Sequence, residues 1–286
     1  MKFRAAIAQI DARVGDLRHN LEHHLAFIER ALKERAQLIL FPELSLSGYT
    51  LRDLVWEAAI DPGSEKLLEL LKKRSKRISI ALVFVESGPH HGIYNAAMFL
   101  EDGAIKHIHR KIYPPTYGMF EEGRYFSRGS RVAAFDSKLG RIGMLICEDL
   151  WHLPLPYLLA HDGAEVILSL TASPTRLAGD SEDLENATIN HEHNRAYARL
   201  LSSYLLFCNR VGFEDGVNFW GGSSVIGPSG ATLALGKYFS EDLVVAEVKS
   251  SEVRRARRFS RHFLDDDPRL VAEHLTRILS YGEKGR

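Results

Sequence analysis

An acid, an amine and a thiol each follow a short apolar run in this chain. Cys147 comes directly after Ile-Gly-Met-Leu-Ile at 142–146 and is followed by two acids. Glu43 comes after residues 36–42, and Lys111 after residues 104–110. Such runs are typical of buried strands, so each group is expected at a strand end, where a side chain can face a pocket. The set predicts a site for covalent catalysis with Cys147 as nucleophile.

The chemistry assigns a role to each group. A thiol with its usual pKa of about 8.5 is mostly protonated at neutral pH and needs a base or a cation nearby. Glu43 is the predicted base, which requires a desolvated carboxylate with a raised pKa. Lys111 is predicted to lower the pKa of the thiol and to stabilise the oxyanion formed by its attack. A second acid, Glu122, is predicted to hold the Lys111 ammonium in place.

Each of these residues also has a simpler explanation. Cys147 alone could be a buried structural cysteine, as Cys208 is predicted to be within the apolar run 205–209. Glu43 could be a turn residue or a helix N-cap acid, and Lys111 lies in a charged patch where a solvated lysine is ordinary. Their occurrence as a set, each at the end of a predicted strand, favours the functional interpretation.

Hydrophobic periodicity predicts an α/β fold with layered, mixed sheets. Strands alternate with helices, and Glu101-Asp102-Gly103 between two apolar runs indicates a hairpin. Helices are predicted at 16–35, 64–76, 154–161 and about 182–202, and strands at 3–10, 38–41, 78–85, 96–100, 104–109, 141–146, 165–170, 205–209, 222–226 and 243–248. We expect one domain over residues 1–286. A charged C-terminal extension from about 251 is expected to pack on the surface or on a second subunit.

Composition excludes several classes of protein. The 286 residues are 45% hydrophobic, enough for a large core. With 37 basic and 37 acidic residues, nothing in the net charge favours nucleic acid or a membrane surface as partner. Two cysteines make no disulfide framework, which favours a reducing compartment. The N-terminus has no signal-peptide pattern, and no apolar run approaches the roughly 20 residues of a membrane helix. A soluble, cytoplasmic protein is expected.

Histidines and arginines suggest two further kinds of site. Among the 13 histidines, His19 and His23 share a predicted helix face without a third ligand, while His191 and His193 point to different faces. We therefore expect neither a metal nor another cofactor. The basic cluster at 254–258 could bind phosphate or nucleic acid, but the aspartates at 265–267 and the zero net charge favour ion pairs.

Taken together, the motifs resemble those of the nitrilase (carbon–nitrogen hydrolase) superfamily, whose triad is Glu, Lys and Cys. Phe-Pro-Glu-Leu-Ser-Leu-Ser-Gly-Tyr at 41–49 matches the motif of the base. The segment 110–126 matches the lysine motif, and its spacing selects Glu122 over the adjacent Glu121. Cys-Glu-Asp-Leu-Trp at 147–151 matches the nucleophile motif, and residues 222–230 resemble the late strand and turn. The resemblance implies an αββα sandwich with two mixed β-sheets.

Within the superfamily, the chain is most similar to the glutaminase domain of glutamine-dependent NAD synthetases. The similarity lies in residues 48–54, 117–126, 147–151 and 172–174. It implies that Tyr117, Glu148 and Ser173 contact the substrate. The basic residue that the family carries a few places further on is absent, and Arg176 is the candidate to replace it. No Ser-Gly-Gly-x-Asp-Ser loop of a synthetase occurs, so we expect no adenylation by this chain.

The resemblance implies a cysteine amidase that hydrolyses a small, glutamine-like carboxamide through a thioester. An N-carbamoyl amine hydrolase is the alternative enzyme. An ammonia-supplying or non-catalytic subunit of a separate synthetase is the alternative of another class. The family also implies a homodimer or higher homo-oligomer.

Overall fold

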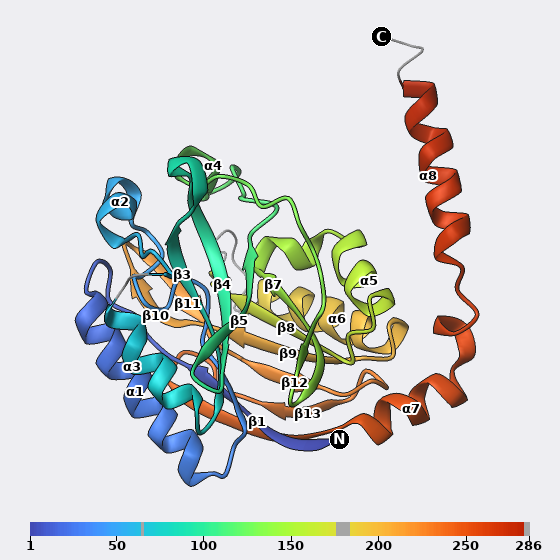
Figure 1. Ribbon diagram of the computed structural model, residues 1–286, viewed down its shortest axis with the longest axis horizontal. Helices are drawn as coiled ribbons and strands as arrows, with labels where there is room; N and C mark the ends of the chain where they lie inside the picture. The colour runs from blue at the N-terminus through green and yellow to red at the C-terminus, as the bar shows by residue number, and fades with distance from the viewer. Residues whose placement is uncertain (64–65, 176–183, 283–286) are drawn as a thin grey trace.

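Two six-stranded mixed sheets form the centre of the molecule. The computed structural model, shown in Figure 1, describes residues 1–63, 66–175 and 184–282. The first sheet has the order β14-β1-β2-β3-β4-β5, in which β1, β2 and β3 are parallel and the other pairs antiparallel. Its strands are β1 (Lys2–Gln9), β2 (Leu38–Leu40), β3 (Ser79–Ser87), β4 (Ile93–Glu101), β5 (Ala104–Arg110) and β14 (Asp242–Lys249).

The second sheet has the order β13-β12-β9-β8-β7-β6, in which β7, β8 and β9 are parallel and the other pairs antiparallel. Its strands are β6 (Phe135–Ser137), β7 (Gly140–Ile146), β8 (Val166–Thr171), β9 (Tyr204–Asn209), β12 (Ser224–Ile226) and β13 (Thr232–Leu235). A separate hairpin pairs β10 (Val211–Glu214) with β11 (Val217–Trp220).

Helices cover the outer face of each sheet. The longer ones are α1 (Leu17–Lys33) and α3 (Lys66–Ser75) on the first sheet, with α5 (Pro154–His161) and α6 (Glu185–Leu200) on the second. Two further helices, α7 (Ser250–Phe259) and α8 (Pro268–Gly282), follow the last strand. The short helical segments are α2 (Val55–Ala58), α4 (Glu122–Tyr125), η1 (Arg52–Leu54), η2 (Pro89–His91), η3 (Cys147–Trp151) and η4 (Arg261–Phe263).

Strand alternation divides the buried side chains among three cores. Along β1, Ala5 and Ile7 join the core between the sheets, whereas Ala6 and Ala8 face α1 and α3. Along β8, Leu168 faces the other sheet and Ile167 faces the helices α5 and α6. Because both faces of these strands are buried, apolar residues occupy successive positions along them, as in 5–8 of β1 and 166–168 of β8. The layers are therefore helix, sheet, sheet and helix, which confirms the expected αββα sandwich.

The parallel strands direct their carboxyl ends to one edge of the sandwich. Glu43 follows β2, Lys111 follows β5 and Cys147 follows β7 at this edge. Backbone hydrogen bonds link the segments there: the Glu43 N–H, after β2, donates to the Thr171 carbonyl oxygen of β8 (3.4 Å), and the Val211 N–H of β10 donates to that of Ile10, after β1 (3.2 Å). Side chains at the ends of several strands are thus brought together, as is usual for ligand sites of open α/β sheets.

All of the predicted strands are present, with ends shifted by a few residues. The predicted helix from about 182 to 202 begins at Glu185 in the structure, and its first two predicted positions lie outside the described residues. The sequence predicted neither the edge strands β6 and β13 nor the β10–β11 hairpin, which are short and mostly lack alternation. The C-terminal extension is helical: α7 begins in contact with the body, whereas α8 projects away from it (Figure 1). In the part of the chain that is described, no helix is long and apolar enough to cross a membrane.

Candidate active site

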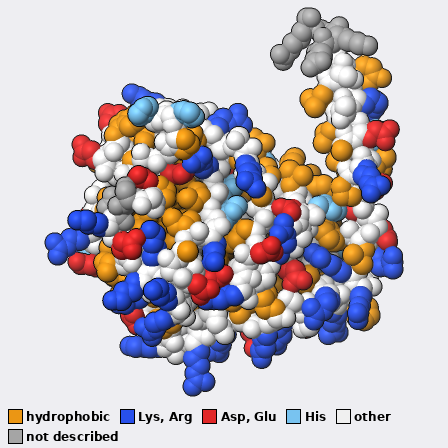
Figure 2. Space-filling model, in the orientation of Figure 1, with side chains coloured by type: hydrophobic (Ala, Val, Ile, Leu, Met, Phe, Trp, Pro, Cys, Tyr) orange, Lys and Arg blue, Asp and Glu red, His pale blue; other side chains and the backbone are white. Residues whose placement is uncertain are grey.

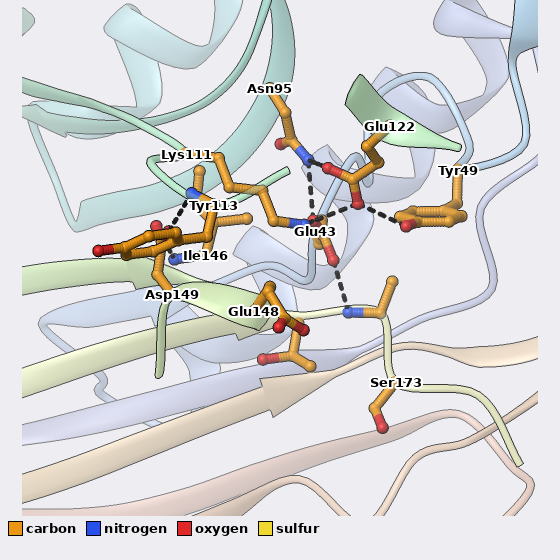
Figure 3. Close-up of polar contacts among 12 residues, drawn as sticks. Glu43, Tyr49, Asn95, Lys111, Tyr113, Glu122, Ile146, Glu148, Asp149 and Ser173 are labelled. Carbon is orange, nitrogen blue, oxygen red and sulfur yellow. Dashed lines mark hydrogen bonds and ion pairs between the residues drawn. The ribbon is translucent and has the colours of Figure 1, made fainter. Parts of the chain in front are cut away.

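The Lys111 ammonium is buried between two carboxylates. Its Nζ lies 2.7 Å from Oε1 of Glu43 and 2.7 Å from Oε1 of Glu122, and the Lys111 side chain is 1% exposed (Figure 3). Burial by itself lowers the pKa of Lys111, but the charges of Glu122 and Glu43 outweigh it and raise the pKa well above its usual value. Lys111 is therefore a fixed cation. Two of its three N–H donors are engaged by carboxylates, which leaves the third for another acceptor.

Glu122 is held from three sides. Besides Lys111, it accepts hydrogen bonds from the Tyr49 hydroxyl (2.5 Å) and from Nδ2 of Asn95 (3.3 Å). Burial raises the pKa of Glu122, the Lys111 charge lowers it and the nearby Glu43 raises it, with a net increase. Burial also raises the pKa of the Tyr49 hydroxyl well above its usual value, so that Tyr49 keeps its proton and donates it.

Glu43 lies on the loop after β2 and reaches across to the second sheet. Its Oε1 accepts from Asn95 Nδ2 (2.8 Å) and Lys111, and its Oε2 accepts from the Ala172 N–H (3.0 Å) just after β8. The carboxylate is 1% exposed by residue. Asn95 on β4 donates to both carboxylates, and Figure 3 shows it above the Lys111 ammonium. The two acids are thus fixed relative to each other.

Cys147 opens η3 at the end of β7, in a left-handed backbone conformation with φ 45°. Burial raises the pKa of its thiol and the negative charge of Glu43 raises it further, while Lys111 lowers it; the net result is a pKa well above its usual value. Lys111 thus acts in the predicted direction but is outweighed. The resting thiol keeps its proton, so its attack on a carbonyl requires a base.

A buried aspartate links the lysine segment to the cysteine turn. Asp149 in η3 accepts from the backbone N–H groups of Ile112 (2.9 Å) and Tyr113 (3.0 Å), and also from that of Ile146 (3.3 Å). His109 on β5 contacts the same carboxylate (Nε2 to Oδ2, 2.8 Å). These bonds fix the start of η3 against the residues that follow Lys111.

The residues predicted to bind substrate lie at different places. The Tyr117 hydroxyl donates to Oε2 of Glu148 (2.7 Å) on the exposed side of η3. Ser173 is 6% exposed, and its hydroxyl accepts from Trp220 Nε1 (3.2 Å) and Asn186 Nδ2 (3.1 Å). Figure 3 shows Ser173 set apart from the Lys111 cluster. Arg176 lies outside the described residues.

Sequence reasoning missed three groups that hold the two acids: Tyr49, Asn95 and the backbone of Ala172. Tyr49 is the last residue of the motif at 41–49, but its spacing in the sequence did not indicate a contact with Glu122. Asn95 follows Tyr94 near the start of a strand, and a polar residue in an otherwise apolar strand was the available signal. No such signal exists for a backbone N–H.

Among the residues that the structure describes, no group of three His, Cys, Asp or Glu side chains could hold a metal ion. His24 is buried and bonded to the Asn20 carbonyl oxygen and the Ser45 hydroxyl. Its role is to fix α1 to the loop that carries Glu43.

Known proteins are similar to this chain in sequence and in fold. A model of the family described as "Carbon-nitrogen hydrolase" matches residues 4–258. A glutamine-dependent NAD(+) synthetase of Xylella fastidiosa (strain Temecula1) is 33% identical over 259 residues, which are 88% of this chain and 45% of that protein. The chain therefore spans about half the length of that relative.

Two solved structures extend the comparison. A glutamine-dependent NAD+ synthetase of Acinetobacter baumannii superposes with a TM-score of 0.78 at 27% identity, covering 88% of this chain and 47% of that one. Nit3 of Saccharomyces cerevisiae, a member of branch 10 of the nitrilase superfamily, gives 0.80 at 25% identity, covering 91% and 94%. With the family model matched over residues 4–258 and the fold shared, the chain belongs to the carbon–nitrogen hydrolase family of the nitrilase superfamily and is a hydrolase of carbon–nitrogen bonds.

Proposed function

We propose that this protein is a cysteine amidase that hydrolyses a small, glutamine-like carboxamide to a carboxylate and ammonia. One observation carries the proposal. A buried ammonium, Lys111, bridges two carboxylates whose charges act on the thiol of Cys147. A nucleophile, a base and a fixed cation in one buried site are the groups that acyl transfer requires.

The first half of the reaction forms the thioester. Glu43 takes the proton of Cys147 as the sulfur attacks the amide carbonyl carbon. The third N–H of Lys111 and backbone N–H groups at the Cys147–Glu148 turn stabilise the oxyanion. Glu43 then returns the proton to the amide nitrogen, the carbon–nitrogen bond breaks, and ammonia leaves.

The second half hydrolyses the thioester. Glu43 removes a proton from a water molecule, which attacks the same carbonyl carbon. The second tetrahedral oxyanion is stabilised as the first was, and its collapse expels the Cys147 sulfur, which recovers the proton from Glu43. One amide and one water thus give one carboxylic acid and one ammonia. Throughout both halves, Glu122 keeps Lys111 in place.

Two observations support a glutamine-like substrate. Glu148, paired with Tyr117, supplies a carboxylate near the nucleophile that suits the ammonium of an amino-acid amide. The synthetases that resemble this chain are named as glutamine-dependent. We therefore propose Tyr117, Glu148, Ser173 and Arg176 as substrate-binding residues, and a separate synthetase as a candidate acceptor of the ammonia.

We also propose that the protein forms a homo-oligomer in a reducing compartment such as the cytoplasm. Support for self-association comes from apolar side chains left exposed on the projecting helix α8, where Figure 2 shows hydrophobic groups along its length. They are Leu270, Val271, Leu275, Ile278, Leu279 and Tyr281. The reducing compartment follows from the thiol, since the chemistry requires a free Cys147.

The test is ammonia release by the wild type and by Cys147→Ala on L-glutamine, small aliphatic amides and N-carbamoyl amino acids. Release from glutamine that depends on Cys147 is the expected result, and stimulation by an added ATP-dependent synthetase would identify an ammonia-supplying subunit. Carbon dioxide released together with ammonia would instead identify an N-carbamoyl amine hydrolase. Full turnover by Cys147→Ala would overturn the mechanism.

A further inference from the structure

We infer that Glu214, on the β10–β11 hairpin outside both large sheets, is a positioning residue that with Arg210 fixes how Tyr49 meets Glu122. The inference rests on the proposed function, because it concerns the same site. Glu214 lies far from Glu43 and Lys111 in the sequence and has no contact with either in the structure's hydrogen-bond network. Its effect is exerted through the loop after β2.

The Glu214 carboxylate binds the backbone of that loop. Both of its oxygens accept from the Tyr49 N–H (2.9 and 3.1 Å), and Oε1 also accepts from the Thr50 N–H. Two successive backbone donors on one carboxylate form a compact anion site, and the bonds are charge-assisted. The carboxylate thereby fixes the backbone from which the Tyr49 ring projects.

Arg210 fixes the carboxylate in turn. Its Nη1 donates to Oε2 of Glu214 (2.7 Å), and its Nη2 donates to the Ala12 carbonyl oxygen (3.1 Å) and to Oδ1 of Asp11 (3.4 Å). The side chains of Arg210 and Glu214 are 1% and 2% exposed. Two charges buried so fully require each other, because either alone would be left without solvation. The pair therefore ties the hairpin, the loop after β1 and the loop after β2 into one unit.

Glycine 48 shows how closely these segments approach. Gly48 has φ +81°, and a Cβ there would lie 2.6 Å from the Cα of Val14 and 3.1 Å from Oε2 of Glu214. Only glycine combines that backbone conformation with that space. The loop is therefore built to rest against the Glu214 carboxylate.

Aromatic contacts also link the hairpin to the Tyr49 ring. The guanidinium of Arg210 lies 4.4 Å from the centre of the Phe219 ring, which packs edge-on against Tyr49 at 6.1 Å. Phe120 packs edge-on against Tyr49 at 6.2 Å. With its backbone and ring both held, the Tyr49 hydroxyl has one direction available, toward Oε1 of Glu122.

The position of Tyr49 matters for the charge on Glu122. The titratable groups that face Glu122 are Lys111, Glu43, Tyr49 and Cys147, and Asn95 donates to it from β4. Burial raises the pKa of Glu122, while Lys111 and the hydrogen bond from Tyr49 lower it. Loss of the Tyr49 bond therefore raises this pKa further. If Glu122 were protonated, the Lys111 ammonium would be paired with the Glu43 carboxylate alone. Glu43 paired more strongly with Lys111 would accept the proton of the Cys147 thiol less readily.

The experiment compares Glu214→Gln, Tyr49→Phe and the double variant. Both the kcat for the best amide substrate and the rate of Cys147 alkylation by iodoacetamide are followed from acid to neutral pH, with intact mass as the readout of alkylation. We expect the acidic limb of both profiles to move to higher pH in each single variant, with kcat at neutral pH about tenfold lower. The double variant should be no worse than the worse single one, because Glu214 acts through Tyr49.

Asp215→Asn is the matched control. Asp215 is the next residue on the hairpin and pairs with Arg52 on the same loop (2.7 Å), but both side chains are more than half exposed. Removing this exposed link between the same two segments should leave both profiles unchanged. Should Glu214→Gln fail to fold, Glu214→Asp keeps the charge on a shorter arm and is expected to shift the limb in the same direction.

The two readouts separate this inference from the proposed function. A wild type without amide turnover would contradict the amidase, whereas the alkylation profiles would still test the role of Glu214. Lower activity in Glu214→Gln with an unmoved acidic limb, or losses that add in the double variant, would show that Glu214 merely supports the fold and would overturn the inference.

Discussion

At the scale of single residues, Lys111 has the largest effect on the charge balance of the site. It contributes the only positive charge to the cluster of Glu43, Glu122 and Cys147 within the described residues, and both acids depend on it. Two carboxylates that are nearly excluded from solvent repel each other, and a cation between them offsets that repulsion. The same residue is therefore both a structural counterion and, in the proposed mechanism, an oxyanion donor.

Lys111→Met keeps the length of the side chain and removes the charge. We expect the free energy of unfolding to fall by about 3 to 5 kcal/mol, because breaking a buried ion pair leaves an uncompensated charge. Turnover should fall at least about a hundredfold, as expected when an oxyanion donor is lost. Urea unfolding and ammonia release measure both effects. Lys138→Met is the control, since its pair with Asp102 is exposed, and it should change neither quantity.

At the scale of elements, the turn from β7 into η3 decides how the thiol is presented. Cys147 takes φ 45° there, a conformation that costs an L-residue about 1–2 kcal/mol. The Asp149 carboxylate holds the turn through the backbone of Ile146, Ile112 and Tyr113. These bonds maintain the strained conformation.

This backbone conformation can be tested without reference to activity. Cys147→Gly and Cys147→Ala should both be inactive, but the glycine variant should be the more stable by about 1 kcal/mol, because glycine adopts positive φ freely. Chemical denaturation measures the difference. In α1, Ala26→Gly should have the opposite sign and destabilise by about 1 kcal/mol, as glycine does within a helix. An alanine variant at least as stable as the glycine variant would refute the assigned strain.

Helix α1 is joined to the catalytic loop through a neutral histidine. His24 donates from Nδ1 to the Asn20 carbonyl oxygen (2.6 Å), accepts from the Ser45 hydroxyl at Nε2 (2.9 Å) and stacks on Phe41. Burial lowers the pKa of His24 from 6.5 to about 3. Below pH 6.5 the unfolded chain thus binds a proton that the folded chain refuses, and stability must decline as the pH falls toward 3.

The expected decline is up to about 1.4 kcal/mol per pH unit from this one residue within that window. His24→Gln should flatten the dependence of the thermal midpoint on pH relative to the wild type. The same measurement on His90→Asn, at an exposed histidine, should retain the slope of the wild type. Parallel curves for wild type and His24→Gln would contradict the assignment of a neutral, buried His24.

At the scale of the whole molecule, the sandwich and the C-terminal helix differ in how they are stabilised. Each sheet is covered on both faces by apolar packing. Helix α8 instead stands away from the body, anchored at its root by Asp266, which contacts His161 (3.0 Å). An amphipathic helix of this length is marginal in water without a partner for its apolar face. The proposed homo-oligomer supplies that partner.

Charges placed on the apolar face of α8 test this proposal. Leu275→Glu with Ile278→Glu should shift sedimentation velocity toward a smaller species and leave the thermal midpoint of the body unchanged. Thr276→Glu places a charge elsewhere on the same helix and should sediment like the wild type. A wild type that sediments as a monomer at all concentrations would remove the basis for self-association.

The sequence by itself identified the residues that we propose for the chemistry, and its resemblance to a known family implied the sandwich around them. Glu43, Lys111 and Cys147 each follow an apolar run, and periodicity located the strands and the longer helices because buried faces leave a repeating pattern. The short hairpin β10–β11 lacks such a pattern, and α7 and α8 were obscured by the charges in the C-terminal segment. The structure of the hairpin depends on contacts with segments distant in the sequence, whereas α8 stands away from the body.

Only the tertiary structure decided how the site is assembled and which way its charges act. Asn95, Tyr49 and the Ala172 N–H reach the two acids because strands of both sheets end at one edge, which the order of residues along the chain does not reveal. The pKa of the Cys147 thiol depends on the balance of burial, Glu43 and Lys111, and the net increase could not be inferred from the lysine alone. Local patterns specify elements, whereas electrostatic balance depends on distances in space.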